Sequence, residues 1–301
     1  MSRMLTLVWT AAFFLVAAVC TAHAQYVIQQ VEYELPVSYE LIPEEIEFAS
    51  EEDEIEFFLN LPTEKLRKAA LAEGRDIREE KITIYIDGNN FAVESMSDEM
   101  GRTTVVSNTN TGVLYYVIWS QKRVYEMKPG DMEKIREKAL EDLPPELREE
   151  ARAEMKREKA KKTDHEKARP TGKKISLYGF ACEQYMVSTD EGVLSVWAAP
   201  DQSGVVGEVS RTSRRFEEHF QTEEDDDVDE WDLVPGKIPV EVRRYAGGMM
   251  MEEPRLTIQA ITKIEKKKPS ADKFKVPGEK EGFTKGSLME MMMEMAPDDS
   301  E

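Results

Sequence analysis

Few side chains in this sequence combine the type and spacing that catalysis needs. Once the N-terminal leader is removed, Cys182 is the only cysteine, and His165 and His219 are the only histidines. A Ser-His-Asp hydrolase would need one of these histidines beside a nucleophile, and the sequence has no Gly-x-Ser-x-Gly elbow and no glycine-rich phosphate loop. One cysteine and two separated histidines also fall short of a structural zinc site. We therefore predict no catalytic residue, no cofactor and no enzymatic activity.

One acidic stretch carries residue types that bind metal ions. Imidazole and carboxylate groups are both competent ligands. The weak metal candidates are His219, Asp225, Asp227 and Asp229. The three aspartates match the spacing of a calcium loop, but Glu230 replaces its glycine and Gly236 falls where the bidentate glutamate belongs. A solvated acidic loop is the favoured interpretation, and we predict no metal site.

Basic residues gather between positions 148 and 174, although the whole chain has a formal net charge of −20. That net charge makes nucleic acid a poor partner. Near an anionic membrane, each basic residue can add about 1 kcal/mol of attraction. The membrane-docking candidates are Lys156, Lys159, Lys161 and Lys162. The alternative, which we favour, is a solvated helical arm with pairs such as Glu158 and Lys162. Peripheral membrane contact is thus the minor hypothesis.

The first 24 residues are typical of a signal peptide. Arg3 precedes an apolar run over residues 4–19, and Ala22 and Ala24 supply the small residues that favour cleavage before Gln25. The run is shorter than the roughly 20 apolar residues of a transmembrane helix. We expect an exported protein, most simply periplasmic, with an extracellular location as the alternative.

Lipid attachment at Cys20 is a minor alternative, because Val19 is a poor match to the small residue such sites prefer. With Cys20 removed, Cys182 has no partner for an intramolecular disulfide. The fold must then rest on packing, and we expect Cys182 to be a buried, inert thiol.

Residues 82–127 and 173–199 alternate apolar and polar side chains and are divided by short turns. Such short connections can join only antiparallel neighbours. Residues 26–35, 238–245 and 256–264 add further strands. The pattern predicts an α+β fold: a single curved antiparallel sheet of about 10–11 strands, forming a half-open β-barrel with helices packed across one face.

Helical periodicity interrupts these strands. We expect a signal peptide at 1–24, one sheet domain at 25–286 with a helical insertion at 131–168, and a Met-rich, acidic tail at 287–301. A further helix places Val205, Val209, Thr212, Phe216 and Phe220 on one side.

Several short motifs resemble those of a family of exported bacterial proteins catalogued as a domain of unknown function. They are TGVLY (111–115), RVYEM (123–127), TGKK (171–174), YGFACEQY (178–185), VWAA (196–199) and FKVPG (274–278). The resemblance covers roughly residues 82–285. Such proteins are similar to the LolA/LolB lipoprotein carriers, which implies a curved antiparallel sheet half-wrapped around a hydrophobic cavity with helices as a lid.

Two functional hypotheses follow. The first is a carrier or sensor that encloses an acyl chain or lipoprotein in an apolar cavity between sheet and helices. Its expected wall residues are Ile84, Phe91, Trp119, Tyr185 and Trp197. The second is an envelope protein that binds other proteins or serves as a structural module. An open apolar cavity would favour the carrier, whereas a filled core would favour the interaction module.

Overall fold

The structure is a computed structural model that describes residues 25–144, 147–149, 152, 168–189, 192–220, 230–246 and 254–295. The expected signal peptide and Cys20 lie outside this part of the chain. Among the described residues, no helix is long and apolar enough to cross a membrane.

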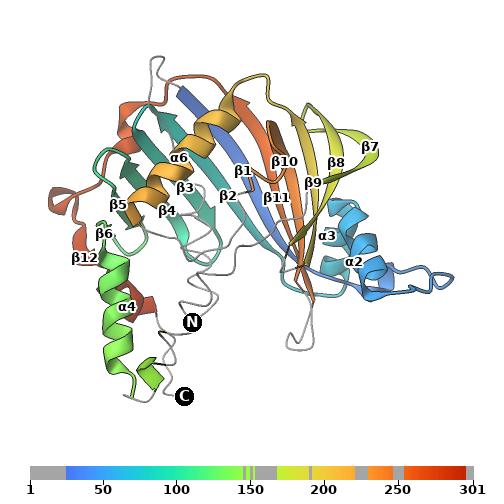
Figure 1. Cartoon of the computed structure of the whole chain (residues 1–301), viewed down its shortest axis with the longest axis horizontal. Helices are drawn as coiled ribbons and strands as arrows, with labels where there is room; N and C mark the ends of the chain where they lie inside the picture. Colours follow the sequence, from blue (N-terminus) through green and yellow to red (C-terminus); the bar gives the residue numbers. More distant parts are fainter. Residues whose placement is uncertain are drawn as a thin grey trace.

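One twelve-stranded sheet dominates the fold (Figure 1). Its strands are β1 (Gln25–Pro36), β2 (Arg78–Asp87), β3 (Asn90–Ser97), β4 (Gly101–Asn108), β5 (Val113–Ile118), β6 (Arg123–Met127), β7 (Arg169–Leu177), β8 (Phe180–Thr189), β9 (Gly192–Pro200), β10 (Lys237–Ala246), β11 (Arg255–Glu265) and β12 (Thr284–Ser287). Their order across the sheet is β12-β6-β5-β4-β3-β2-β1-β11-β10-β9-β8-β7. Every neighbouring pair is antiparallel except β12 and β6, which are parallel.

The α+β class with one large sheet is thereby confirmed, whereas the expected strand count of about 10–11 is too low. The missed strand is β12, whose Thr-Lys-Gly-Ser sequence has no apolar alternation. It pairs with β6 in parallel, from Thr284 beside Arg123 to Ser287 beside Glu126. Short-range patterns cannot reveal such a pairing, because its two strands are far apart in the sequence.

Different helices pack against the two faces of the sheet. Five helices are described: α2 (Glu51–Asn60), α3 (Thr63–Ala72), α4 (Asp131–Asp142), α6 (Val205–Phe220) and α7 (Leu288–Met295). Short 3-10 turns occupy Tyr39–Leu41, Ala271–Phe274 and Glu279–Glu281. Figure 1 shows α6 crossing the sheet on the side around which the strands curve. We call this side the inner face and the opposite side the outer face.

Strand register places one continuous apolar row on the inner face. Residues paired directly across an antiparallel sheet share a face. The row runs through Ile28, Ile84, Val93, Val105, Tyr116 and Tyr125, each paired with the next. All six are buried in one apolar cluster, which also takes in residues of α6 and α7.

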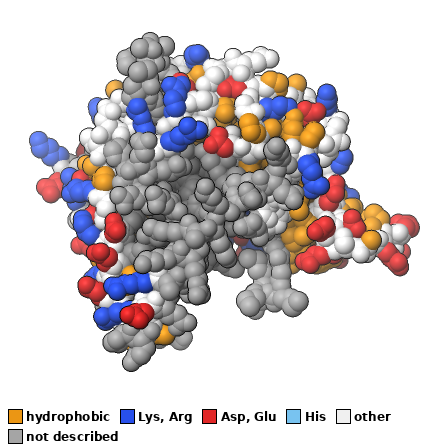
Figure 2. Space-filling view, viewed as in Figure 1, with side chains coloured by type: hydrophobic (Ala, Val, Ile, Leu, Met, Phe, Trp, Pro, Cys, Tyr) orange, Lys and Arg blue, Asp and Glu red, His pale blue; other side chains and the backbone are white. Residues whose placement is uncertain are grey.

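On the outer face, α2 packs against β9 and β10, and α3 packs against β1. Phe58 of α2 and Leu66 of α3 are buried with Leu35 and Ile258. Arg243 of β10 reaches the end of α2, where its guanidinium donates to the carbonyl oxygens of Leu59, at 3.0 Å, and of Leu61. Acidic side chains gather at the end of the molecule where α2 lies (Figure 2), in keeping with the four acidic residues of its first turn.

The C-terminal part differs from the expected tail at 287–301. Residues 284–295 extend the sheet edge and continue as α7, in which Leu288 and Met291 are buried in the inner-face cluster. The methionine-rich sequence gave a weak signal because its apolar residues are consecutive rather than periodic. Of the helical insertion expected at 131–168, the structure describes α4 and a few residues beyond it.

Candidate binding site on the inner face

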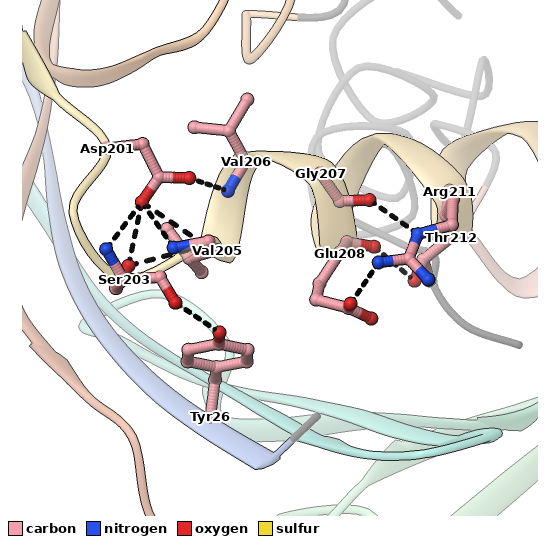
Figure 3. A network of polar contacts seen from close by, with 10 residues as sticks. Tyr26, Asp201, Ser203, Val205, Val206, Gly207, Glu208, Arg211 and Thr212 are labelled. Atoms are coloured by element: carbon pink, nitrogen blue, oxygen red, sulfur yellow. Dashed lines mark hydrogen bonds and ion pairs between the residues drawn. The ribbon is translucent and has the colours of Figure 1, made fainter. Parts of the chain in front are cut away.

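The start of α6 is fixed by a dense set of hydrogen bonds. Asp201 Oδ1 accepts from the backbone N–H of Ser203 (3.0 Å) and Gly204 (2.8 Å), and Oδ2 accepts from Val206 N–H (2.9 Å), as Figure 3 shows. Burial opposes ionisation of Asp201, but these hydrogen bonds outweigh it and hold the carboxyl pKa below its usual range. The carboxylate therefore serves as the cap of this helix.

A second contact ties the same turn to the floor of the sheet. The hydroxyl of Tyr26, on β1, donates to the Ser203 carbonyl oxygen at 2.7 Å (Figure 3). Val205, Val206 and Val209 then bury their side chains in the inner-face cluster. The first half of α6 is thus held over the apolar floor by one cap, one tyrosine and three valines.

A small cavity lies on the inner face beside α7. It has a volume of about 10 Å³, room for roughly one water molecule, and lies between the β4–β6 floor and α7. Its lining residues are Val105, Leu114, Tyr116, Tyr125, Glu126, Met127, Leu288 and Met291. This part of the floor has no room for an acyl chain.

A row of buried and half-buried polar side chains borders the apolar floor. Glu32 of β1 is paired in register with Glu80 of β2 and with Gln259 of β11. The Gln259 amide Nε2 donates to Glu32 Oε2 at 3.0 Å, and the Ser95 hydroxyl donates to Glu80. Polar groups thus interrupt an otherwise apolar surface at the centre of the sheet.

Burial controls the ionisation of both carboxyl groups. It raises the Glu32 pKa to about 7, helped by the nearby negative charges of Glu80 and Glu34 and opposed by Gln259 and by Arg244. Burial likewise raises the pKa of Glu80 above its usual range, against the hydrogen bond from Ser95. Glu32 therefore changes charge near neutral pH.

A second small cavity adjoins this polar row. It too has a volume of about 10 Å³, and it lies under Trp231, a residue that is 2% exposed. Its lining residues are Gln30, Glu230, Trp231, Pro239, Val242, Gln259 and Ile261. The cavity therefore has polar groups on its floor and an aromatic side chain as its cover.

The structure separates the five residues expected to line an apolar cavity. Ile84 and Phe91 lie together in the inner-face cluster, and Trp197 packs against that cluster while half-buried. Trp119 is half-buried elsewhere, where its indole Nε1 donates to Thr104 Oγ1 at 2.8 Å. The five residues therefore do not line one common space.

Tyr185 belongs to a different apolar cluster, with Val196 and Leu233. Its hydroxyl donates to Glu183 Oε2 at 2.7 Å and accepts from Lys237. Register places Trp197 opposite Glu241 and Gln184, so its side chain shares a face with theirs. These polar partners are typical of residues that hold the sheet together.

The remaining sequence candidates are only partly covered by the structure. His219 lies within α6, but its side chain is outside the described part, as are Asp225, Asp227, Asp229 and the four docking lysines Lys156, Lys159, Lys161 and Lys162. Burial raises the pKa of the Cys182 thiol to about 11, as expected for an inert cysteine. Within the described ranges, no group of three or more histidine, cysteine, aspartate or glutamate residues could hold a metal ion.

The residues that sequence reasoning missed are Gln30, Glu32 and Gln259. A signal for the first two was present in the printed sequence. On β1, Gln30 and Glu32 continue the alternation that places Tyr26 and Ile28 on the inner face, so they are polar residues at inward positions. Gln259 could be added only once the β1–β11 register was known.

Comparison with known proteins adds no assignment: no family model matches this sequence, and no curated protein matches it. The resemblance to exported proteins of the LolA/LolB type thus remains a proposal. The site must be interpreted from its own geometry.

Proposed function

We propose that this protein is a non-enzymatic component of the bacterial envelope that binds an amphipathic ligand, such as a lipid or the acylated end of a lipoprotein, on the inner face of its sheet. The observation that carries the proposal is the composition of that face. A continuous apolar row from Ile28 to Tyr125 borders the polar groups of Glu32, which is half-buried, and of Gln259, which is buried. A ligand with an apolar chain and a polar head matches both parts.

The cover of the inner face supports this function. Among the described residues, the inner-face cluster is covered by side chains of α6, α7 and Trp231 rather than by a second sheet. Each of the two described cavities has room for about one water molecule, which is too small for an acyl chain. An acyl chain can enter only when α6 or Trp231 moves away. The sheet would then act as a half-open barrel.

Material purified from the native envelope tests the proposal. We expect native mass spectrometry and solvent extraction to find a co-purifying lipid or acylated peptide. The mature protein should also take up 1-N-phenylnaphthylamine, an apolar dye that fluoresces in dry surroundings. Protein that is free of lipid and takes up no dye would contradict ligand binding.

A pair of cap variants tests the role of α6. Asp201→Ala removes the cap of α6, so we expect dye uptake to become several-fold faster as the helix detaches more often. Losing such a cap costs about 0.5–2 kcal/mol. Ser50→Ala is the matched control, because Ser50 Oγ caps α2 on the outer face by accepting from Asp53 N–H at 3.2 Å. Equal effects of both variants on the uptake rate would rule out α6 as the lid.

A second function is favoured by the small size of the two cavities. If the packed inner face is permanent, the protein is an interaction or structural module of the envelope, and its partners are other proteins. The same dye and lipid measurements separate the two functions, because a permanently filled core takes up neither ligand.

A further inference from the structure

Two amide oxygens on the inner face are buried without a partner. Gln30 is 4% exposed and Gln259 is 7% exposed, and both line the cavity beneath Trp231. The Oε1 atoms of these two residues accept no hydrogen bond within the described structure. A buried acceptor without a donor loses its hydration and gains nothing in return. Such atoms are rare in folded proteins, and a pair that lines one cavity indicates a missing donor.

Several groups around the two oxygens are themselves acceptors. Gln259 already gives its amide Nε2 to Glu32, and Glu230 also lines the cavity. Glu80 and Glu34 add negative charge beside Glu32, and Arg244 opposes them. Glu34 is itself ion-paired with Arg78 and Arg255, each at 3.2 Å, so Glu80 is the neighbouring acid without a cation partner among the ion pairs described. A carboxylate or phosphate placed in this cavity would face lone pairs and acidic groups. A hydroxyl or ammonium group would meet acceptors.

The apolar floor begins next to these oxygens. Gln30 is paired in register with Ile82 on one side and with Ile261 on the other, and both isoleucines are buried in the inner-face cluster. A head group held at Gln30 therefore has an apolar surface beside it, leading towards Ile84 and Phe91. The cavity is also the size of one water molecule, which matches a single hydroxyl or ammonium group.

We propose that Gln30 and Gln259 recognise the head of the amphipathic ligand, and that this head is a hydrogen-bond donor, hydroxyl or ammonium, rather than a carboxylate or phosphate. The assignment rests on the proposed ligand-binding function and specifies its ligand class. The ligand's apolar chain lies along the floor formed by β1–β6. The head supplies the hydrogen-bond donor that the two amide oxygens lack.

The pH dependence of binding distinguishes the two donor heads. The groups that act on Glu32 are Glu80, Glu34, Arg244 and Gln259, and Glu230 lies across the cavity. An ammonium head favours ionised Glu32, so its affinity should rise several-fold between about pH 6 and about pH 8, where Glu32 loses its proton. A hydroxyl head carries no charge, so its affinity should change little over this range.

Three ligands of equal chain length test the assignment on the mature full-length protein. Decylammonium, decanol and decanoate each compete with 1-N-phenylnaphthylamine for the inner face. We expect decanol or decylammonium to displace the dye at concentrations about tenfold lower than decanoate. Tightest binding of decanoate would overturn the assignment but leave the proposed function in place. If the dye itself does not bind, the proposed function has failed.

Variants of the acceptors complete the test. Gln30→Met keeps the size of the side chain and removes the oxygen, so donor heads should bind about 2- to 10-fold more weakly while decanoate does not. Gln29→Met is the matched control, because Gln29 is the adjacent residue and is exposed. Gln259→Met serves as a second variant if Gln30→Met does not fold. Unchanged affinity in the folded variants would mean that the cavity holds only water, and would overturn the assignment.

Discussion

Glu32 and Glu94 lie on opposite faces of the same sheet, and their pKa values shift in opposite directions. Glu32, on the inner face, accepts a hydrogen bond from the neutral amide of Gln259, and burial raises its pKa to about 7. Glu94, on the outer face, forms ion pairs with Lys273 (2.9 Å) and Arg102 (2.7 Å). Burial opposes the ionisation of Glu94 too, but these cations outweigh it and lower the pKa.

The difference lies in how each face compensates its carboxylates. On the outer face, Glu94 and Glu241 are paired with cations, although Nε of Arg67 and of Arg102 is buried without a hydrogen-bond partner. On the inner face, Glu34 is paired with Arg78 and Arg255, but Glu32 and Glu80 have neutral partners and two amide oxygens have none, an arrangement that costs folding free energy. Polar groups that cost folding free energy are typical of functional sites. The predictions below test this contrast between the faces.

The largest change in unfolding free energy should come from a substitution on the outer face. Arg243 and Glu241 form a buried ion pair of 2.7 Å, with side chains 7% and 2% exposed. Arg243→Met leaves Glu241 as an unpaired buried charge and removes the donors to the end of α2, so we expect a loss of about 3–5 kcal/mol in unfolding free energy. Urea denaturation of the variant measures it.

A double variant provides the control. Adding Glu241→Gln to Arg243→Met removes the stranded charge and should recover part of the lost stability. A loss below about 1 kcal/mol in the single variant would show that this ion pair does not hold the outer face together.

Replacing Glu32 should raise the free energy of unfolding rather than lower it. A folded-state pKa raised from 4.5 to about 7 means that the carboxyl's contribution is complete below pH 4.5 and is lost as pH rises to about 7. Glu32→Gln keeps a neutral group there. We therefore expect the variant to be more stable than the native protein by about 1–3 kcal/mol at pH 8, with little difference at pH 4. Urea denaturation at both pH values checks the sign.

Much of the sheet could be predicted from local patterns. Ile82, Ile84 and Ile86 alternate with polar residues, and a tight turn follows at Gly88, whose φ is 61°. These features fix β2 and β3 as a hairpin without any knowledge of the rest of the chain. The antiparallel order of β2–β6 follows in the same way.

The candidate site could not be predicted so directly, because it depends on long-range register. Glu32 meets Gln259 only through the pairing of β1 with β11, which are separated by most of the chain. Aromatic residues misled the cavity prediction for a related reason. Trp119 bonds to Thr104 on the outer face, whereas Tyr185 lies on the inner face by register but packs in a different cluster from Ile84 and Phe91. Residue type alone does not tell which neighbours a strand residue packs against.

The smallest change in unfolding free energy should come from replacing Glu94 on the outer face. Glu94→Gln removes the charge that Lys273 and Arg102 share, while the Tyr85 hydroxyl, 3.2 Å from Oε2, retains an acceptor. Because these groups are partly solvated, we expect a loss of only about 0.5–1 kcal/mol at pH 7. The lowered pKa means that the native carboxylate stabilises the fold above its unfolded pKa and that this contribution is lost on acidification. The variant should therefore be as stable as the native protein near pH 3, so the stability loss caused by Glu94→Gln becomes smaller as pH falls. For Glu32→Gln, it is a stability gain that becomes smaller as pH falls. A stability gain from Glu94→Gln at pH 7 would show that the two faces treat buried acids alike.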